Sequence, residues 1–197
     1  MSGQNKVSGV VLAGGLARRM GLRDKGLMPF NNRPLVGYAL AAMAPLVDEL
    51  LISANRNQED YKQFGYPVIG DSNPTFDGPL AGILAAMRVA QNTVLLVMPC
   101  DSPLVETRHL QRLLAALATQ SVDIALVYDG KRLHPVFAAL KTSLSLQTDL
   151  QNYLQHGERK LENWFNRHSA IKVDFSDTPE IFANINTPAE LQALEKN

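Results

Sequence analysis

The sequence predicts an α/β fold, a Rossmann-like, mostly parallel twisted sheet with helices on both faces. Short apolar runs typical of buried strands alternate with longer segments in which apolar residues recur at helical spacing. The first apolar run, residues 7–12, leads directly into a Gly-Gly pair. With 197 residues, of which 46% are hydrophobic and 19% charged, the chain is long enough to bury a sizeable core. We therefore expect a globular protein rather than a disordered one.

The first two thirds of the chain predict alternating strands and helices. Strands are expected at residues 7–12, 49–53, 68–69, 94–98 and 123–128. Helices are expected between them at residues 34–43, 58–64, 80–90 and 106–118. Pro34 suits the first position of the first helix, where its missing N–H costs nothing. Connections of this kind are right-handed crossovers, which place successive strands parallel and helices on both faces of the sheet.

The last third of the chain departs from this alternation. Residues 133–140 predict a strand with no full crossover helix before it, so one antiparallel strand is expected here. Helices are expected at residues 144–155 and 161–165, followed by a strand at 171–175. Thr187-Pro188-Ala189-Glu190 reads as a capping box with proline at the first helical position, and it predicts a final helix. We expect a single domain over residues 1–197, with about 1–128 and about 129–197 as its two parts.

Composition excludes several classes of protein. The 19 basic residues balance the 19 acidic ones, so no nucleic-acid surface is expected. Cys100 is the only cysteine, which rules out an internal disulfide and fits a reducing compartment. No apolar run reaches about 18 residues, and the polar start of the chain has no signal-peptide core. The sequence therefore predicts a cytoplasmic protein without a membrane partner.

The Gly14-Gly15 pair after the first strand is a candidate anion-binding loop. Without Cβ atoms the backbone can approach a ligand and turn its N–H groups towards phosphate oxygens. Arg18, Arg19 and Lys25 add positive charge within ten residues of the second glycine, and together these parts suit a nucleoside triphosphate. Neither a Walker loop nor a GxGxxG fingerprint is present. The alternatives are a tight strand-to-helix turn and a solvated helix start.

Candidate ligand-binding residues stand at four predicted strand ends, which converge on one edge of a parallel sheet. These ends carry Ala13-Gly14-Gly15, Ser53-Ala54-Asn55, Asp71 and Cys100-Asp101. Asp101 is the candidate Mg²⁺ ligand, since phosphoryl-transfer enzymes hold Mg²⁺ with one or two carboxylates and substrate oxygens. Its alternative role is a helix N-cap. Asp71 either accepts hydrogen bonds from a base or ribose or caps a turn, and Cys100 reads as a small buried residue.

Several motifs resemble the nucleotidyltransferases that transfer NMP onto cofactors and sugars, in particular the molybdenum cofactor guanylyltransferases. The resemblance starts with LAGGLARRMG at residues 12–21 and DKGL at residues 24–27. It continues through Gly78-Pro79-Leu80-Ala81-Gly82, Pro99-Cys100-Asp101, His134-Pro135, Gly157-Glu158-Arg159 and Asn184-Ile185-Asn186-Thr187-Pro188. It implies a nucleotidyltransferase-type fold, and transfer of GMP from GTP to the terminal phosphate of Mo-molybdopterin, with Mg²⁺ and release of pyrophosphate.

The resemblance also implies roles for individual residues. Asp101 would bind Mg²⁺, and Arg19 and Lys25 would neutralise the phosphates as the bond to the α-phosphorus breaks. The nucleotide would contact Leu12, Ala13, Gly14, Gly15, Lys25, Ser53, Asn55, Asp71, Gly78, Gly82 and Asp101. Relatives often have Asn at position 53, which puts the Ser53 contact in doubt, whereas LAGG favours guanine. Gly78 and Gly82 either admit the base or allow tight packing.

The acceptor is expected in the last third of the chain. Arg159, Asn184 and Asn186 would hold the molybdopterin, although asparagines before a helix are also common turn residues. Delivery of an unstable cofactor implies transient contacts with molybdenum cofactor assembly proteins and apo-molybdoenzymes.

Two other functions fit the sequence. One is a nucleotidyltransferase for another base or acceptor, such as CTP or a sugar or polyol phosphate. The other is a non-catalytic GTP-binding module that delivers a cofactor, which would need the glycine loop but not Asp101.

Overall fold

A seven-stranded sheet forms the centre of the protein. The computed structural model describes residues 6–13, 24–71, 78–182 and 190. The strands follow the order β5-β4-β1-β6-β8-β7-β9 across the sheet. They are β1 (Val7–Leu12), β4 (Glu49–Ser53), β5 (Val68–Ile69), β6 (Val94–Pro99), β7 (Ile124–Tyr128), β8 (Leu133–Lys141) and β9 (Ala170–Asp174). A separate two-stranded sheet pairs β2 (Pro29–Phe30) with β3 (Arg33–Pro34).

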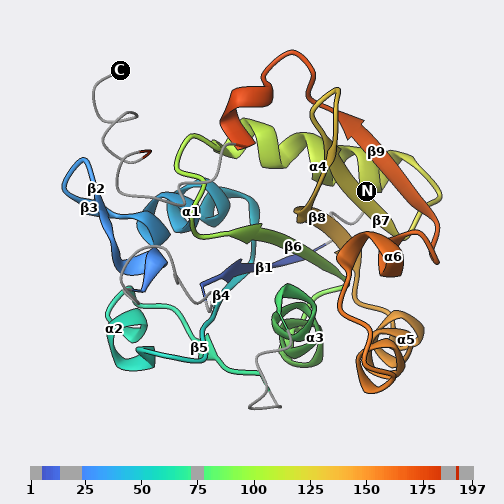
Figure 1. Cartoon of the computed structure of the whole chain (residues 1–197), viewed down its shortest axis with the longest axis horizontal. Helices are drawn as coiled ribbons and strands as arrows, with labels where there is room; N and C mark the ends of the chain where they lie inside the picture. The colour runs from blue at the N-terminus through green and yellow to red at the C-terminus, as the bar shows by residue number, and fades with distance from the viewer. Residues whose placement is uncertain (1–5, 14–23, 72–77, 183–189, 191–197) are drawn as a thin grey trace.

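The large sheet is mostly parallel, as predicted. β1 pairs in parallel with β4 and β6, β4 with β5, and β7 with β9. β8 runs antiparallel to both of its neighbours, β6 and β7, and lies between them (Figure 1). The predicted antiparallel strand is thus confirmed. Its insertion between two parallel strands was not predicted, and it follows from the short turn that folds β8 back onto β7.

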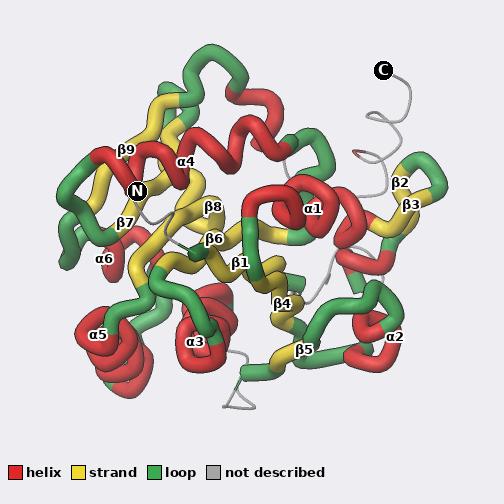
Figure 2. Tube along the Cα trace, turned by 180° about the vertical axis from the view of Figure 1, so that it is seen from behind, coloured by secondary structure: helices red, strands yellow, loops and turns green. Residues whose placement is uncertain are grey.

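Helices cover both faces of the sheet, as predicted. They are α1 (Leu35–Met43), α2 (Gln58–Lys62), α3 (Pro79–Val89), α4 (Thr107–Thr119), α5 (Leu144–Gln155) and α6 (Leu161–Phe165), with 3-10 turns η2 (Lys25–Leu27), η3 (Ala44–Leu46) and η4 (Pro179–Phe182). α1 and α4 lie on one face, and α3, α5 and α6 on the other (Figures 1 and 2). Within the described residues, no helix has both the length and the hydrophobicity of a membrane-spanning segment.

The predicted helix boundaries need small corrections. Pro34 is not the first residue of α1 but the residue before it, because its ψ of 140° is extended and it still belongs to β3. α2 ends at Lys62, before the predicted limit at Phe64. The final helix predicted from the capping box at Thr187-Pro188 lies outside the described residues.

The central strands are buried on both faces, as their continuous apolar runs predicted. Successive residues of β1 alternate between the two cores: Val10 packs with the α3 and α5 side, and Val11 with the α1 and α4 side. Leu95 and Leu96 of β6 alternate in the same way. Burial on both faces fixes the register of these strands, because a one-residue slip would exchange the two cores.

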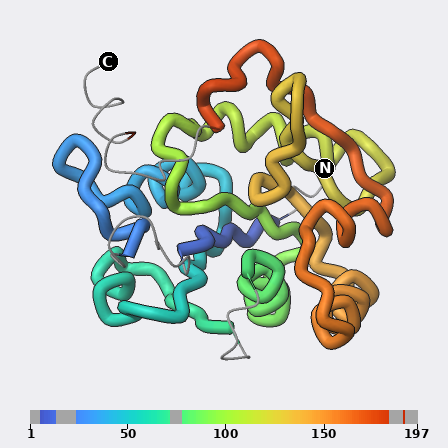
Figure 3. The backbone as a smooth tube through the Cα atoms, viewed as in Figure 1, coloured from blue at the N-terminus to red at the C-terminus, as the bar shows by residue number. Residues whose placement is uncertain are grey.

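The candidate ligand-binding edge is defined by the parallel strands. β1, β4, β5 and β6 are neighbours that run in the same direction, so their carboxyl ends meet at one edge. In the chain trace of Figure 3, the blue to cyan residues 24–70 lie on one side of the molecule and the orange residues 144–165 on the other. The described loops at this edge begin at residues 13, 54, 70 and 100.

Candidate active site

An ion pair between Lys25 and Asp101 stands at this edge. Asp101 is the second residue after β6, and Lys25 is the first residue of η2, 76 residues away in sequence. The Lys25 side chain is only 14% exposed and the Asp101 side chain 13%. In a largely buried ion pair each charge stabilises the other. Replacing one of the two residues by an uncharged one leaves the other charge buried and unpaired, which destabilises the protein. The structure therefore brings together two residues that the sequence assigned to the triphosphate and the metal.

The second carboxylate oxygen of Asp101 is available for a cation. Asp101 Oδ1 is buried and makes no hydrogen bond with any described residue. A buried acceptor without a donor is costly, and a cation would remove that cost. Among the described residues no three His, Cys, Asp or Glu side chains gather as a metal site. The donor set fits Mg²⁺ held by a carboxylate together with substrate phosphate oxygens.

The turn that carries Lys25 is held by Asp24. The Asp24 Oδ1 atom accepts a hydrogen bond from the backbone N–H of Gly26 at 3.2 Å and another from the Tyr61 hydroxyl. Asp24 Oδ2 accepts a hydrogen bond from Asn57 Nδ2 at 3.0 Å. The sequence analysis included Asp24 in the DKGL motif but gave it no role, and it missed Asn57 and Tyr61. The signal for Asp24 was present, since aspartate before a short helix is a preferred N-cap.

Tyr61 connects this turn to the end of β1. Its side chain is fully buried, and its hydroxyl oxygen lies 3.4 Å from the carbonyl oxygen of Ala13, the residue before the glycine pair. Burial is the main cause that raises the pKa of Tyr61 far above its ordinary range, and the neighbouring Cys100 and Asp24 add to it. The hydroxyl therefore stays protonated and can act as a donor.

Cys100 is a buried free thiol, as the sequence predicted. Burial raises its pKa well above the usual value, and the negative charge of Asp101 adds to this effect. A thiol held in its neutral form is a poor nucleophile.

Leu12 and Ala13 are fixed by backbone hydrogen bonds at the strand ends. The Ala13 N–H donates to the Ser53 carbonyl at 2.8 Å, and the Cys100 N–H donates to the Leu12 carbonyl at 3.1 Å. The pairing of β1 with both neighbours thus continues to the point where the glycine loop starts. Gly14, Gly15, Arg18 and Arg19 lie outside the described residues.

Gly82 lies against Ser53 and Leu12. A Cβ atom on Gly82 would stand 2.7 Å from Ser53 Oγ and 3.1 Å from Leu12 Cδ2. Ser53 is 5% exposed. Gly82 thus allows α3 to approach β1 and β4 closely, which supports the packing role among the two left open. Gly78, before α3, has a φ of 74° and is exposed, and this backbone conformation favours glycine.

Asn55 and Asp71 are paired with each other. Asn55 Nδ2 donates to Asp71 Oδ2 at 2.7 Å, and the Asp71 N–H donates to Asn55 Oδ1 at 2.7 Å. The pair joins the loops that follow β4 and β5, so two residues predicted at separate strand ends form one polar unit.

The predicted acceptor residues are only partly described. Arg159 follows α5, and its Nη1 atom donates to the carbonyls of Leu154 at 2.8 Å and Glu158 at 2.7 Å. Asn184 and Asn186 lie outside the described residues. The described residues before them end at Phe182, which packs against His134 with ring centroids 5.2 Å apart. His134 Nε2 lies 2.6 Å from Asp129 Oδ2.

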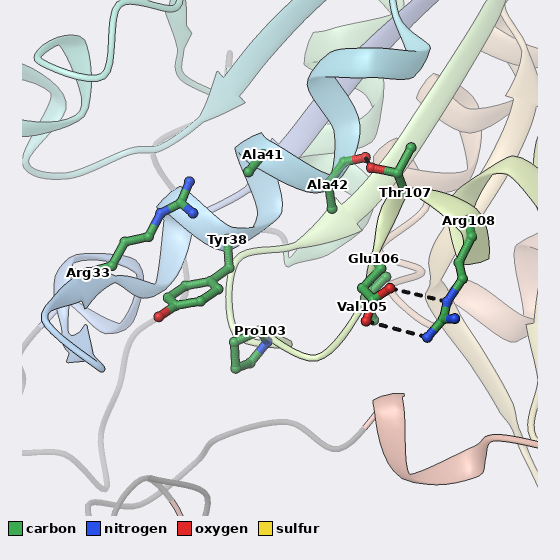
Figure 4. Close-up of a pocket in the computed structure, with 9 residues that line it drawn as sticks. All are labelled: Arg33, Tyr38, Ala41, Ala42, Pro103, Val105, Glu106, Thr107 and Arg108. Carbon is green, nitrogen blue, oxygen red and sulfur yellow. Dashed lines mark hydrogen bonds and ion pairs between the residues drawn. The ribbon is translucent and has the colours of Figure 1, made fainter.

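A hollow of about 390 Å³ opens between α1 and residues 103–108, next to the loop of Asp101 (Figure 4). Arg33 and Arg108 stand on its walls, and the protein itself engages both. The Arg33 guanidinium lies over the Tyr38 ring, 5.0 Å from its centroid, and Arg108 Nε lies 3.1 Å from Glu106 Oε2. Glu106 therefore neutralises Arg108. Arg33 keeps its positive charge, because among the described residues it contacts only the uncharged Tyr38 ring and the Gly37 carbonyl.

Known proteins resemble this chain over most of its length. Residues 9–171 match the family model of the MobA-like NTP transferase domain. A molybdenum cofactor guanylyltransferase of Shewanella loihica is 44% identical over 191 residues, which cover 97% of this chain and 96% of the relative. The chain belongs to this guanylyltransferase family. The enzyme of the same name from Shewanella halifaxensis is 44% identical over 189 residues, 96% of this chain and 94% of the relative.

The fold comparison agrees with this membership in the guanylyltransferase family. The molybdopterin-guanine dinucleotide biosynthesis protein A of Archaeoglobus fulgidus superimposes with a TM-score of 0.79 at 22% identity, covering 96% of this chain and 97% of that one. At this identity the likeness concerns the fold. The resemblance predicted from the sequence motifs, and with it the class of nucleotidyltransferases, is confirmed.

Proposed function

We propose that this member of the guanylyltransferase family transfers GMP from GTP to the terminal phosphate of Mo-molybdopterin and releases pyrophosphate. The observation that carries the proposal is the Lys25–Asp101 pair at the carboxyl edge, with one buried carboxylate oxygen left for a cation. The relatives named molybdenum cofactor guanylyltransferase support the choice of substrates.

In the proposed reaction an oxygen of the acceptor phosphate attacks the α-phosphorus of GTP. The new P–O bond forms as the bond between the α-phosphorus and the bridging oxygen breaks, and the electron pair leaves with pyrophosphate. A phosphate monoester is already anionic at neutral pH, so no general base is needed. The protein contributes positioning and stabilisation of charge.

Asp101 and Lys25 divide the electrostatic work. Asp101 would hold Mg²⁺, which when bound neutralises and orients the phosphate oxygens. Lys25 would place its ammonium group against the charge that develops on the leaving pyrophosphate. Arg19 would grip two phosphate oxygens with its guanidinium fork. Gly14 and Gly15 would admit the triphosphate to the backbone N–H groups.

The remaining site residues are assigned to the two substrates. Leu12, Ala13, Ser53, Asn55, Asp71, Gly78 and Gly82 would form the nucleotide side. Arg159, Asn184 and Asn186 would hold the molybdopterin, so about residues 1–128 would serve GTP and about residues 129–197 the acceptor. The reaction would run in the cytoplasm. Assembly proteins and apo-molybdoenzymes would meet the protein transiently to exchange the cofactor.

Pyrophosphate release with Mg²⁺ and Mo-molybdopterin, compared among GTP, CTP and ATP, tests the proposal. Release with GTP alone supports both the reaction and the base. Release with CTP would leave the mechanism intact but contradict guanine selection. A protein that binds GTP without Mg²⁺ and releases no pyrophosphate would instead be a GTP-binding delivery module. Release only with a sugar or polyol phosphate would identify another acceptor.

A further inference from the structure

The buried hydroxyl of Tyr61 contacts Asp24, the residue before Lys25 in the proposed site. We infer that Tyr61 is a positioning residue, which acts through Asp24 to fix the turn that holds Lys25 against Asp101. The inference rests on the proposed role of Lys25 in the transfer reaction. It adds α2, an element that none of the sequence motifs included, to the parts that determine turnover.

The contacts of the Tyr61 hydroxyl connect three pieces of the site. The hydroxyl donates to Asp24 Oδ1, which also accepts the Gly26 N–H at 3.2 Å. It lies 3.4 Å from the Ala13 carbonyl oxygen, at the start of the glycine loop. Tyr61 therefore sets the distance between the end of β1 and the turn that carries Lys25.

The turn has little room to move against this ring. A Cβ atom on Gly26 would lie 2.4 Å from the Tyr61 hydroxyl oxygen and 3.2 Å from Cys100 Sγ. The Tyr61 ring is fully buried, so it cannot swing aside as a flexible surface side chain would. Asn57, next to α2 in sequence, holds the other oxygen of Asp24 at 3.0 Å. Both carboxylate oxygens of Asp24 thus accept a hydrogen bond from a residue in α2 or directly before it.

A fixed turn matters because lysine is flexible. A lysine side chain loses much of its rotamer entropy when it is held in one position. A displacement of about 1 Å in a catalytic group can cost about 100-fold in rate. Anchoring the backbone of Lys25 reduces the number of positions that its ammonium group can occupy, and so favours the position in contact with the phosphates. We therefore expect the loss of the Tyr61 hydroxyl to lower kcat more than it weakens GTP binding.

The first test replaces Tyr61 with phenylalanine, which keeps the ring and removes the hydroxyl. We expect kcat for GMP transfer to fall about tenfold, with KM for GTP changed by less than about threefold. Tyr153→Phe is the matched control. Tyr153 is buried on the other face of the sheet and donates to the Lys160 carbonyl at 3.0 Å. The Tyr153→Phe variant should lose about as much thermal stability as Tyr61→Phe, but its kcat should stay at the wild-type value.

A double-mutant cycle separates positioning from general destabilisation. In a Lys25→Met background, Tyr61→Phe should change the residual kcat by less than about twofold, because the group it positions is gone. Asp24→Asn keeps one acceptor oxygen for Tyr61 and Gly26 but loses the acceptor for Asn57, so it should lose less activity than Asp24→Ala, which should lose at least as much as Tyr61→Phe. A full tenfold loss in the Lys25→Met background would overturn the inference.

Chemical labelling of Lys25 gives a readout that does not depend on the reaction. The Lys25 side chain is 14% exposed and its ammonium group is paired with Asp101, so trinitrobenzenesulfonate should label it slowly in the wild type. We expect Tyr61→Phe to raise the rate about fivefold or more, and Tyr153→Phe to leave it unchanged. An unchanged rate in Tyr61→Phe refutes the positioning role. Faster labelling with no pyrophosphate release by the wild type would refute the proposed function and leave the positioning role standing.

Discussion

The ammonium group of Lys25 and the carboxylate of Asp101 form a nearly buried ion pair across 76 residues of sequence. Each charge is stabilised by the other in the absence of substrate. One oxygen of Asp101 is used in the pair, and the other makes no hydrogen bond within the described part of the chain. In a magnesium nucleotide, the Mg²⁺ ion is attracted to the Asp101 carboxylate and the phosphates are attracted to the Lys25 ammonium group. The two side chains are thus in place before the nucleotide binds.

Replacing Asp101 with asparagine should reduce GMP transfer by at least about 100-fold, because the uncharged amide binds Mg²⁺ poorly. The loss of charge beside Lys25 should also lower stability, by about 1–3 kcal/mol. Steady-state kinetics and urea unfolding measure the two effects separately. Asp177→Asn, at an exposed carboxylate that pairs with Arg112, is the control. Near-normal turnover in Asp101→Asn would remove Asp101 from the mechanism.

Replacing Lys25 with methionine should separate metal binding from catalysis. Lys25 competes with a cation for Asp101, so its removal should increase the rise in Tm that millimolar Mg²⁺ produces without nucleotide. Turnover should fall about 100-fold all the same, because the charge on the leaving pyrophosphate is no longer neutralised. Thermal unfolding with and without Mg²⁺ tests the first part. If Mg²⁺ raises the Tm of Lys25→Met no more than that of the wild type, Lys25 does not compete for the carboxylate.

Gly82→Ala should destabilise the protein by about 1–2 kcal/mol, although alanine is the better helix former. The new methyl group would stand 2.7 Å from Ser53 Oγ, and α3 would have to move away from the sheet. In a Ser53→Ala background the same change should be nearly neutral or stabilising. Urea unfolding of the four proteins gives the coupling energy. An equal cost in both backgrounds would show that the Ser53 hydroxyl is not what excludes a side chain at position 82.

The positions of the central strands and their parallel direction were predictable where local signals were strong, but their order in the sheet was not. The runs at 7–12, 49–53 and 94–98 are apolar on both faces, and this is why they became the parallel centre of the sheet. The neighbours of β8 could not be predicted from the sequence, because its pairing with β6, such as Val94 with Lys141, joins residues that no local signal connects. Periodicity reports which face is buried but not which strand lies alongside.

The site was predictable to the same degree. Lys25 and Asp101 carry charge in motif positions, and the parallel topology places both at one edge. Tyr61 sits in a helix with no motif, and its partner Asp24 is 37 residues away. A single tyrosine in a polar segment gives no sign that its hydroxyl is buried. Residues that act by holding another residue are visible only when the contacts are known.

His109 should make stability depend on pH. It is the N3 residue of α4, and its Nδ1 atom accepts the Glu106 N–H at 3.0 Å, which requires an unprotonated nitrogen. Burial is the main cause that lowers the pKa of His109, and the charge of Arg108 adds to it. The unfolded chain therefore binds the proton more readily, and the contribution of His109 to stability, complete above about pH 6.5, is lost as the pH falls below that value.

His109→Gln should remove this part of the pH dependence. Glutamine is the ordinary N3 partner in a capping box, so its side-chain oxygen can accept the Glu106 N–H without titrating. Between pH 7.5 and pH 5.5 we expect the free energy of unfolding to fall more steeply in the wild type than in the variant. Arg108→Gln should give an intermediate slope, because it removes only the lesser cause of the lowered pKa. Parallel slopes for wild type and His109→Gln in urea unfolding would contradict the assignment.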